Sequence, residues 1–485
     1  VLTLACLPYE ALYSSRAILV TNWRLLISHR RLLEWNPSGN LKRSRKGTTL
    51  AGIYTSMLVF CPLSALAMFL YLSLGSPITL FIAFPILALW LIAPAMVWWV
   101  SRPLAKEAVK LSQEQMVFLQ KSALRTWAYF DELVTEKDNW LPPDNIQLHP
   151  ETKLAHRTSP TNMGFSLLAN LAAMDFGYIT CGQFLERTQK SLGAMHSLER
   201  YRGHFYNWYD TVSMEVLHPR YVSTVDSGNL AGHLLVLRQG LLVLHKQKIW
   251  NGDLFKGLRD TWNIVMELVP DGQRTSAIQN DFFSGNHQKL ESLEKSRFYL
   301  EGLCAALAAL ARQLDSKPSG EAREWVEMLE NRAKNALEEI SFLAPWILHP
   351  RPPARFAALL NKIRIPTLGE LRDLERELWP LVNQLKVEGV SEEENAWLEG
   401  FLPCIAEASR RAEDRLTLID SLAARAEDMA YVDYDFLYDK SQHLLSIGFN
   451  ADDHRRDPSY YDLLASEARM GIFVSISQGK IQQDA

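Results

Sequence analysis

The stretch from residue 201 to residue 211, YRGHFYNWYDT, combines aromatic rings with basic, amide and acidic groups. A pyranose needs this combination, because its C–H face stacks on an aromatic ring while its hydroxyls bind carboxylate, amide and guanidinium groups. The stretch therefore predicts a sugar-binding surface, and the alternative is an aromatic cluster that packs a loop. The candidate ligand contacts here are Arg202, His204, Tyr206, Asn207, Trp208, Tyr209 and Asp210.

Four carboxylates are candidates for glycoside chemistry: Asp210, Asp226, Asp462 and Glu467. A retaining mechanism needs two carboxyl groups about 5 to 5.5 Å apart, and an inverting mechanism needs about 6.5 to 9.5 Å. Spacing along the chain does not give these distances, so each candidate keeps a structural alternative. Asp226 could be a helix cap, and Glu467 could pair with Arg469 or Arg456.

Two further polar segments extend the predicted binding surface. VDSGN at 225–229 adds Ser227 and Asn229 beside Asp226, and SYYDLLASEAR at 459–469 adds Tyr461 and Arg469. Both segments lie where a helix is predicted to begin. Helix-starting loops that carry such groups are typical of one end of an α/α toroid, where the inner helices converge on a pocket.

Amphipathic helices are predicted through most of the chain after residue 104. Apolar residues recur three and four positions apart, as on the buried face of a helix, and no run of alternating β-branched residues stands out. The predicted fold class is all-α, with charge-rich accessory helices at about 317–430. The helical ranges are about 104–134, 162–178, 181–197, 228–247, 253–268, 297–315, 320–343, 368–387, 392–430 and 460–478.

Two uncharged apolar runs, at 51–73 and 78–100, predict a transmembrane hairpin. Each run has about 23 residues, enough to cross a hydrocarbon layer of roughly 30 Å. Lysine and arginine are in excess on both flanks, which predicts that both ends face the cytoplasm. Segment 16–35 mixes leucine and tryptophan with arginine, and predicts a helix on the anionic leaflet or a helix packed on another domain. The lipid bilayer is thus an expected partner.

Composition argues against several other functions. The formal net charge of −4 disfavours a nucleic-acid partner. The five cysteines lie far apart with no CxxC pair, which disfavours a zinc site or a disulfide framework. The spacing fits a reducing compartment or cysteines that serve as small hydrophobic residues. The sequence has neither a Walker loop nor a dinucleotide fingerprint, so we expect no cofactor in this region.

Seven motifs resemble, in the same order, the central region of cyclic β-1,2-glucan synthases, a family of large bacterial inner-membrane enzymes. The segment LPYEALYSSRAILVTNWRLLISHRRLLEW at 7–35 is similar to the stretch that follows their glycosyltransferase domain. The others are WLPPDN (140–145), HRTSPTNMGFSLLANLAAMDFGYI (156–179), RYRGHFYNWYDT (200–211), YVSTVDSGNLAGHL (221–234), FLYDKSQHLLSIGFN (436–450) and SYYDLLASEAR (459–469).

The resemblance implies three parts: a basic juxtamembrane segment at 1–50, a hairpin at 51–100 and a glycoamylase-like (α/α)6 domain at 101–485. In the family such a domain is associated with closing linear β-1,2-glucan into a ring by transglycosylation. The resemblance also implies an inner-membrane location, and the basic flanks predict that the helical domain lies on the cytoplasmic side. The glucan would be made from UDP-glucose by a glycosyltransferase domain absent here, so the expected partners are the glucan and the other domains of the synthase.

The family pattern continues past residue 485, and the resemblance places the acid and nucleophile glutamates there. We therefore expect an incomplete toroid that binds glucan and turns it over weakly or not at all, with Asp210, Asp226 and Glu467 as the candidates inside the chain. One rival is a stand-alone (α/α)6 glycoside hydrolase, which would need a working acid pair among the four carboxylates above. The other is a noncatalytic, membrane-tethered helical scaffold.

Overall fold

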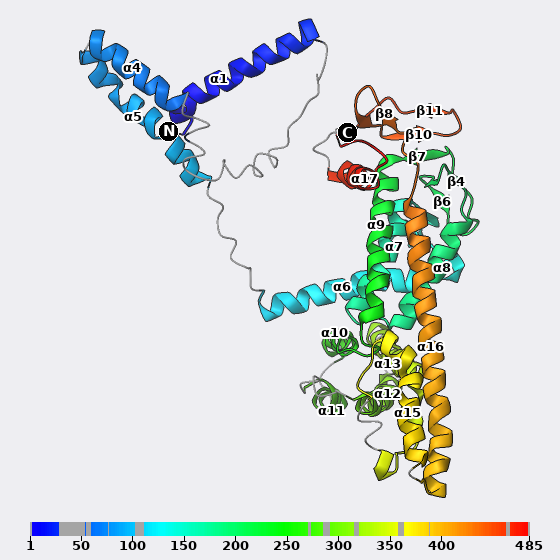
Figure 1. The fold of residues 1–485 in the computed structure, drawn as a ribbon. Coiled ribbons are helices and arrows are strands. Elements are labelled where there is room, and N and C mark those ends of the chain that lie inside the picture. Colours follow the sequence, from blue (N-terminus) through cyan, green and yellow to red (C-terminus); the bar gives the residue numbers. More distant parts are fainter. Residues whose placement is uncertain are drawn as a thin grey trace. The chain divides into compact units, whose positions relative to one another are not determined.

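The chain divides into two compact units, Val1–Lys110 and Leu111–Ala485. The computed structural model describes residues 2–28, 54, 60–75, 77–101, 111–269, 273–284, 292–314, 320–356, 363–387, 389–461 and 466–483. Figure 1 shows the elements of both units. The finer division of the first unit at residue 50 remains a prediction.

The described residues of the first unit form three long helical segments. Helix α1 (Leu2–Trp23) continues into a π-helical turn, η1 (Arg24–Ser28), and packs against α5 (Pro77–Val100). Helix α4 (Cys61–Gly75) pairs with α5 as a hairpin. Among the described residues, α5 is the one helix long and apolar enough to cross a membrane, with a mean hydropathy of 2.4. Most of residues 51–59, the predicted start of the first span, and residues 29–35 lie outside the described residues.

The second unit is helical, and the predicted all-α class is confirmed. Its described helices are α6 (Gln113–Leu133), α7 (Pro160–Asp175), α8 (Cys181–Ser197), α9 (Thr224–Val243), α10 (Asp253–Leu268), α11 (Gln273–Ile278), α12 (Leu293–Leu314), α13 (Gly320–Leu343), α15 (Leu368–Val387), α16 (Glu392–Ala430) and α17 (Ser466–Ser477). Short helical turns connect them: η3 (Glu136–Asp138), η4 (Leu244–Lys246), η5 (Gln279–Phe283), η7 (Pro345–Leu348) and η8 (Ala354–Phe356).

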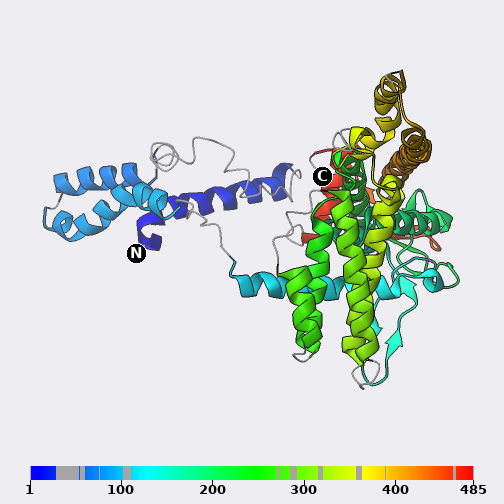
Figure 2. The same ribbon diagram turned by 90° about the horizontal axis from the view of Figure 1, so that it is seen from below.

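Helix α9 lies among three other helices, α7, α16 and α17 (Figure 1, Figure 2). Helix α16 runs for 39 residues and contacts both α15 and α9. Ser409, near its middle, bonds to the backbone of α15, whereas Glu427, near its end, pairs with Arg238 of α9. The charge-rich stretch predicted as accessory therefore contributes its last turns to the packing around α9.

Local capping explains where several helices begin. Ser112, Thr180 and Ser391 each form a capping box with the residue three positions later. The start predicted for α9 at Asp226 or Ser227 is wrong, because the cap is Ser223, whose hydroxyl accepts the N–H of Asp226. Asp226 thus lies inside the first turn of α9.

Short antiparallel strands, which were not predicted, connect the helix starts. Strand β3 (Arg157–Thr158) pairs with β6 (Tyr209–Asp210) in the register Arg157 opposite Asp210, which puts these two side chains on one face. The other strands are β1 (Ile146–Gln147) with β2 (Lys153–Leu154), β4 (Arg200–Tyr201) with β5 (His204–Phe205), β8 (Tyr438–Asp439) with β9 (Leu444–Leu445), and the sheet β11 (Arg455–Arg456), β10 (Gly448–Asn450), β7 (Tyr221–Ser223).

Candidate functional site

The starts of α7 and α9 lie side by side and share hydrogen bonds. Ser159 caps α7 and Ser223 caps α9, so the first turn of each helix is fixed. The Thr161 hydroxyl of α7 donates to Asp226 Oδ1 of α9 at 2.6 Å. Asn229, one turn further along α9, donates its amide to Thr161 Oγ1 at 3.3 Å. The two helix starts therefore present one connected polar group.

The loop that carries Trp208 joins this polar group. With its side-chain amide oriented to satisfy both neighbours, Asn207 donates to Asp226 Oδ2 at 3.1 Å and accepts from Trp208 Nε1 at 3.2 Å. Two backbone bonds hold the loop: the Asn207 N–H donates to Tyr221 O of β7, and the Leu217 N–H donates to Trp208 O. Trp208 is half-buried, so part of its ring remains accessible.

A guanidinium group covers one side of the Trp208 ring. Arg157 lies 4.6 Å from the ring centroid, a cation–π contact. Its Nη2 donates to Asp144 Oδ2 at 3.1 Å, and the Asn162 amide donates to Asp144 Oδ1 at the same distance. Since Asn162 follows Thr161, these contacts form a closed ring. We call this set the Trp208 cluster: Asp144, Arg157, Thr161, Asn162, Asn207, Trp208, Asp226 and Asn229.

The Trp208 cluster can bind a hydroxyl-rich ligand but does not by itself supply acid catalysis. Both Asp226 oxygens accept hydrogen bonds from protein groups, which is the arrangement of a fixed acceptor and not of a proton donor. Asp144 is occupied by Arg157 and Asn162 in the same way. In the part of the chain that the structure describes, no group of three histidine, cysteine or acidic residues could hold a metal ion.

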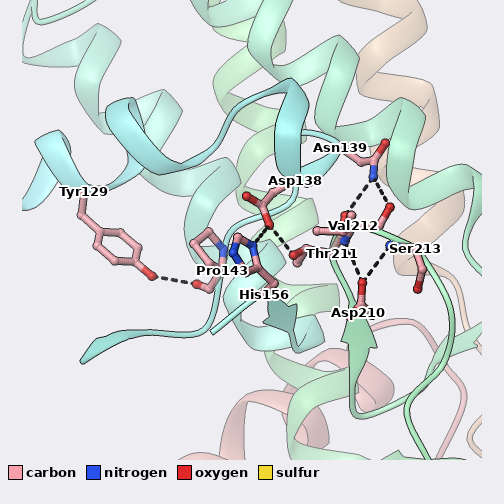
Figure 3. Close-up of polar contacts among 9 residues, drawn as sticks. All are labelled: Tyr129, Asp138, Asn139, Pro143, His156, Asp210, Thr211, Val212 and Ser213. Carbon is pink, nitrogen blue, oxygen red and sulfur yellow. Dashed lines mark hydrogen bonds and ion pairs between the residues drawn. The ribbon is translucent and has the colours of Figure 1, made fainter. Parts of the chain in front are cut away.

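The carboxylate of Asp210 closes a turn at the edge of the cluster (Figure 3). Its Oδ1 accepts the backbone N–H groups of Val212 and Ser213 at 2.9 and 2.7 Å. The amide of Asn139 donates to the carbonyl oxygens of Thr211 and Val212. The structure thus gives Asp210 a turn-forming role that its sequence position did not predict.

A buried carboxylate supports the same turn from the other face of the β3–β6 ladder (Figure 3). Asp138 is 2% exposed and accepts the Thr211 hydroxyl at 2.5 Å. It also bonds to His156 Nδ1 at 2.7 Å. Because neighbouring strand residues point to opposite faces, His156 lies behind Arg157 and anchors the strand from below the cluster.

Four predicted contacts lie beneath the surface: His204, Ser227, Tyr206 and Tyr209. His204 is buried, and burial lowers its pKa to about 4, so the ring is neutral. Its Nε2 donates to the Asp433 carbonyl at 2.6 Å, which leaves Nδ1 to accept from Ser227 Oγ at 2.8 Å. Tyr209 is 0% exposed; its hydroxyl accepts the Tyr206 N–H and donates to the Glu199 carbonyl. Tyr206 is buried beside it. These side chains support the loop from the core, so we do not assign them a contact with the ligand.

The remaining predicted contacts are dispersed. Arg202, at the turn between β4 and β5, pairs with Asp433 at 3.4 Å, and Arg469 is exposed on α17. Tyr461 is half-buried and lies near Tyr221. The pKa of Tyr221 is raised to about 12, mainly by burial and in the same direction by the nearby Asp457 and Tyr461. Asp462 and the side chain of Glu467 lie outside the described residues.

Helix α17, which carries Glu467, packs closely on α9. A Cβ added to Gly228 would lie 2.3 Å from the Cα of Gly471, so only glycine fits at this contact. Glu467 is one helical turn before Gly471, and Gly471 also lies beside the carbonyl of Thr224. The packing therefore brings the Glu467 segment toward the first turn of α9.

Four members of the cluster were not singled out from the sequence: Asp144, Arg157, Thr161 and Asn162. All four belong to motifs that carried the resemblance, WLPPDN and HRTSPTNMGFSLLANLAAMDFGYI, but none of them was assigned to the predicted binding surface. The available signal was the density of polar side chains immediately before and inside the first turn of α7.

Comparisons with known proteins give one extended match. No protein-family model matches the chain. The chain is 30% identical over 489 aligned residues to the cyclic β-(1,2)-glucan synthase NdvB of Rhizobium meliloti (strain 1021). The match covers 99% of this chain but only 15% of that protein's length. The resemblance predicted from the motifs is therefore confirmed over nearly the whole chain.

A solved structure of a predicted glucoamylase from Bacteroides fragilis NCTC 9343 is also similar, at 19% identity and a TM-score of 0.24. The similarity covers 36% of this chain and 41% of that one. A likeness at this level carries no conclusion about the fold.

Proposed function

We propose that this chain is part of a membrane-bound cyclic β-1,2-glucan synthase and that its helical unit binds β-1,2-glucan during transglycosylation. The relative's name supports the glucan, and the Trp208 cluster supports the binding site. The single observation that carries the proposal is the link from Trp208 through Asn207 to Asp226, because it places a half-exposed indole near a carboxylate and amides.

A glucose unit would use the cluster as follows. Its C–H face stacks on the accessible part of the Trp208 ring, an interaction of about 0.5–1.5 kcal/mol beyond the area buried. Its hydroxyls donate to Asp226 and accept from Asn229, and the guanidinium of Arg157 adds further donors. Because the cluster is held together by its own hydrogen bonds, little reorganisation opposes binding.

Catalysis would need groups beyond those in the cluster. Cleaving and re-forming a glycosidic bond takes a proton donor at the leaving oxygen and a second carboxylate at the anomeric carbon. We propose that both come from other residues of a longer synthase, which complete the (α/α)6 toroid. UDP-glucose would then be the donor for a separate glycosyltransferase domain, and this region would use no cofactor.

The first unit would place this site at the membrane. We propose that α4 and α5 form a hairpin in the bacterial cytoplasmic membrane, with both ends and the helical unit on the cytoplasmic side. Helix α5 supports the membrane location, and the basic residues on both flanks support the orientation. The bilayer and the other domains of the synthase would be its partners.

Calorimetric titration of the full chain in detergent with linear β-1,2-glucan tests the binding site. Trp208→Ala should weaken binding about tenfold, which corresponds to the loss of one ring contact. The control is Trp379→Ala, because Trp379 is 55% exposed on α15, far along the chain from the cluster. Unchanged affinity in the Trp208 variant would reject the cluster as the site.

Product analysis tests the catalytic half. The chain alone, incubated with linear β-1,2-glucan, should yield little or no ring product. Efficient ring formation that disappears on Glu467→Gln would show that the acid lies inside this chain and would reject the proposed division of labour.

A further inference from the structure

A backbone carbonyl in α1 lacks its usual helical partner. Pro8 lies inside α1. Proline has no N–H, so the carbonyl of Leu4, four residues earlier, cannot make its helical hydrogen bond. The indole Nε1 of Trp90, on α5, donates to this carbonyl at 3.0 Å. A side chain of one helix thus replaces a backbone bond of another.

Small residues surround this hydrogen bond and let the helices approach closely. Ala5 and Cys6 of α1, Cys61 of α4 and Ala93 of α5 are buried together. Tyr9 continues the contact, with its ring 6.1 Å from that of Phe60. Close approach through small residues together with an interhelical hydrogen bond is the typical packing of helices in membranes.

The outer surface around this contact is apolar. Residues 2–9 carry no charge, and Leu7 is 50% exposed. On α5, Leu91 and Ile92, which follow Trp90, are 51% and 48% exposed. The first charged residue of α1 is Glu10, and Arg16 follows. The uncharged first part of α1 is therefore the part that packs on the hairpin.

We infer that residues 2–9 of α1 are a third membrane-embedded segment, held on α5 by the Trp90–Leu4 hydrogen bond and surrounded by the acyl chains of the bilayer. Inside hydrocarbon no water can satisfy the carbonyl that Pro8 leaves open, so a protein donor is required there. Glu10 and Arg16 then mark where the helix leaves the apolar layer. The inference extends the proposed hairpin and does not depend on glucan binding.

Alkylation of Cys6 tests the hydrogen bond. The full chain is reconstituted in phosphatidylcholine liposomes, and the rate of Cys6 modification by N-ethylmaleimide is measured by mass spectrometry. Trp90→Phe keeps a ring but removes the donor, and should speed modification about tenfold by loosening the contact. Trp99→Phe is the matched control, because Trp99 is 70% exposed on the same helix.

A double variant makes the test specific. Pro8→Ala restores an N–H to the Leu4 carbonyl, so Trp90 is no longer needed there. Pro8→Ala with Trp90→Phe should therefore modify more slowly than Trp90→Phe alone. An unchanged rate in Trp90→Phe, or no recovery in the double variant, would overturn the role given to Trp90.

A fluorescent probe tests the lipid contact. The native cysteines are replaced by alanine, helix content is checked by circular dichroism, and a nitrobenzoxadiazole group is attached at Leu7→Cys or, as the control, Ser15→Cys. Lipids that carry a nitroxide on the acyl chain should quench the probe at residue 7 more than at residue 15. Stronger quenching of residue 7 by aqueous iodide would overturn the membrane placement.

Discussion

Among the described residues of the second unit, the ion pair between Glu339 and Arg415 should be the charged contact most sensitive to substitution. Its side chains are 7% and 10% exposed, with N–O distances of 2.5 and 3.2 Å. Glu339 also accepts the N–H of Gly182, so it joins α13 to α16 and to the start of α8. The pair lines a pocket of about 70 Å³.

Glu339→Gln should lower the free energy of unfolding by about 3–5 kcal/mol, because it leaves the Arg415 charge buried without a partner. Replacing both residues together, as in Glu339→Leu with Arg415→Leu, should recover most of that loss. The control is Asp414→Asn, which removes an exposed partner of Arg410 on the same α16 and should leave stability unchanged.

The assay is urea unfolding of the full chain in detergent, followed by circular dichroism. A change below about 1 kcal/mol for Glu339→Gln would show that the pair is solvated and would refute the reasoning from burial. Equal losses for the single and the double variant would show that packing, and not an uncompensated charge, sets the effect.

Three further predictions follow from other residues. Asp226→Asn should weaken β-1,2-glucan binding about tenfold in calorimetry, whereas Asp210→Asn should not, because the carboxylate of Asp210 serves a turn. Burial raises the pKa of Asp260 from 3.8 to about 6, so the folded state binds a proton more readily than the unfolded chain, and its contribution to stability should grow as pH falls from 7 to 4. Unfolding of the wild type and Asp260→Asn across that range measures the contribution, and parallel curves would contradict it. A cysteine introduced at Asn40 should resist reagents confined to the periplasm, and labelling there would contradict the proposed orientation.

The sequence alone determined where most helices of the second unit lie. The predicted bounds of α8, α10, α13, α15 and α16 agree with the structure at both ends. Helix periodicity and caps such as Thr180 and Ser391 are local signals, so no knowledge of the tertiary structure is needed to detect them. The start of α9 was missed because the cap, Ser223, precedes the apolar repeat.

The sequence also showed which segments are rich in groups suited to a sugar, but not which side chains are accessible. Within residues 206–209, Tyr206 and Tyr209 enter the core while Trp208 stays at the surface. The two-residue strands are too short for an alternation pattern to reveal these faces. Long-range contacts decide them, among them the register of β3 with β6 and the backbone bond from Asn207 to Tyr221.

Only the tertiary structure decided which polar groups meet. Thr161 and Asp226 are 65 positions apart, yet their side chains are 2.6 Å apart because two capped helices begin side by side. The same packing places Arg157 over Trp208 and bonds it to Asp144. The carboxylate of Asp210 instead accepts a hydrogen bond from its own turn. Residue type limits what a side chain can do, but the chemistry of a site depends on distances that are fixed only when separate helices pack against each other.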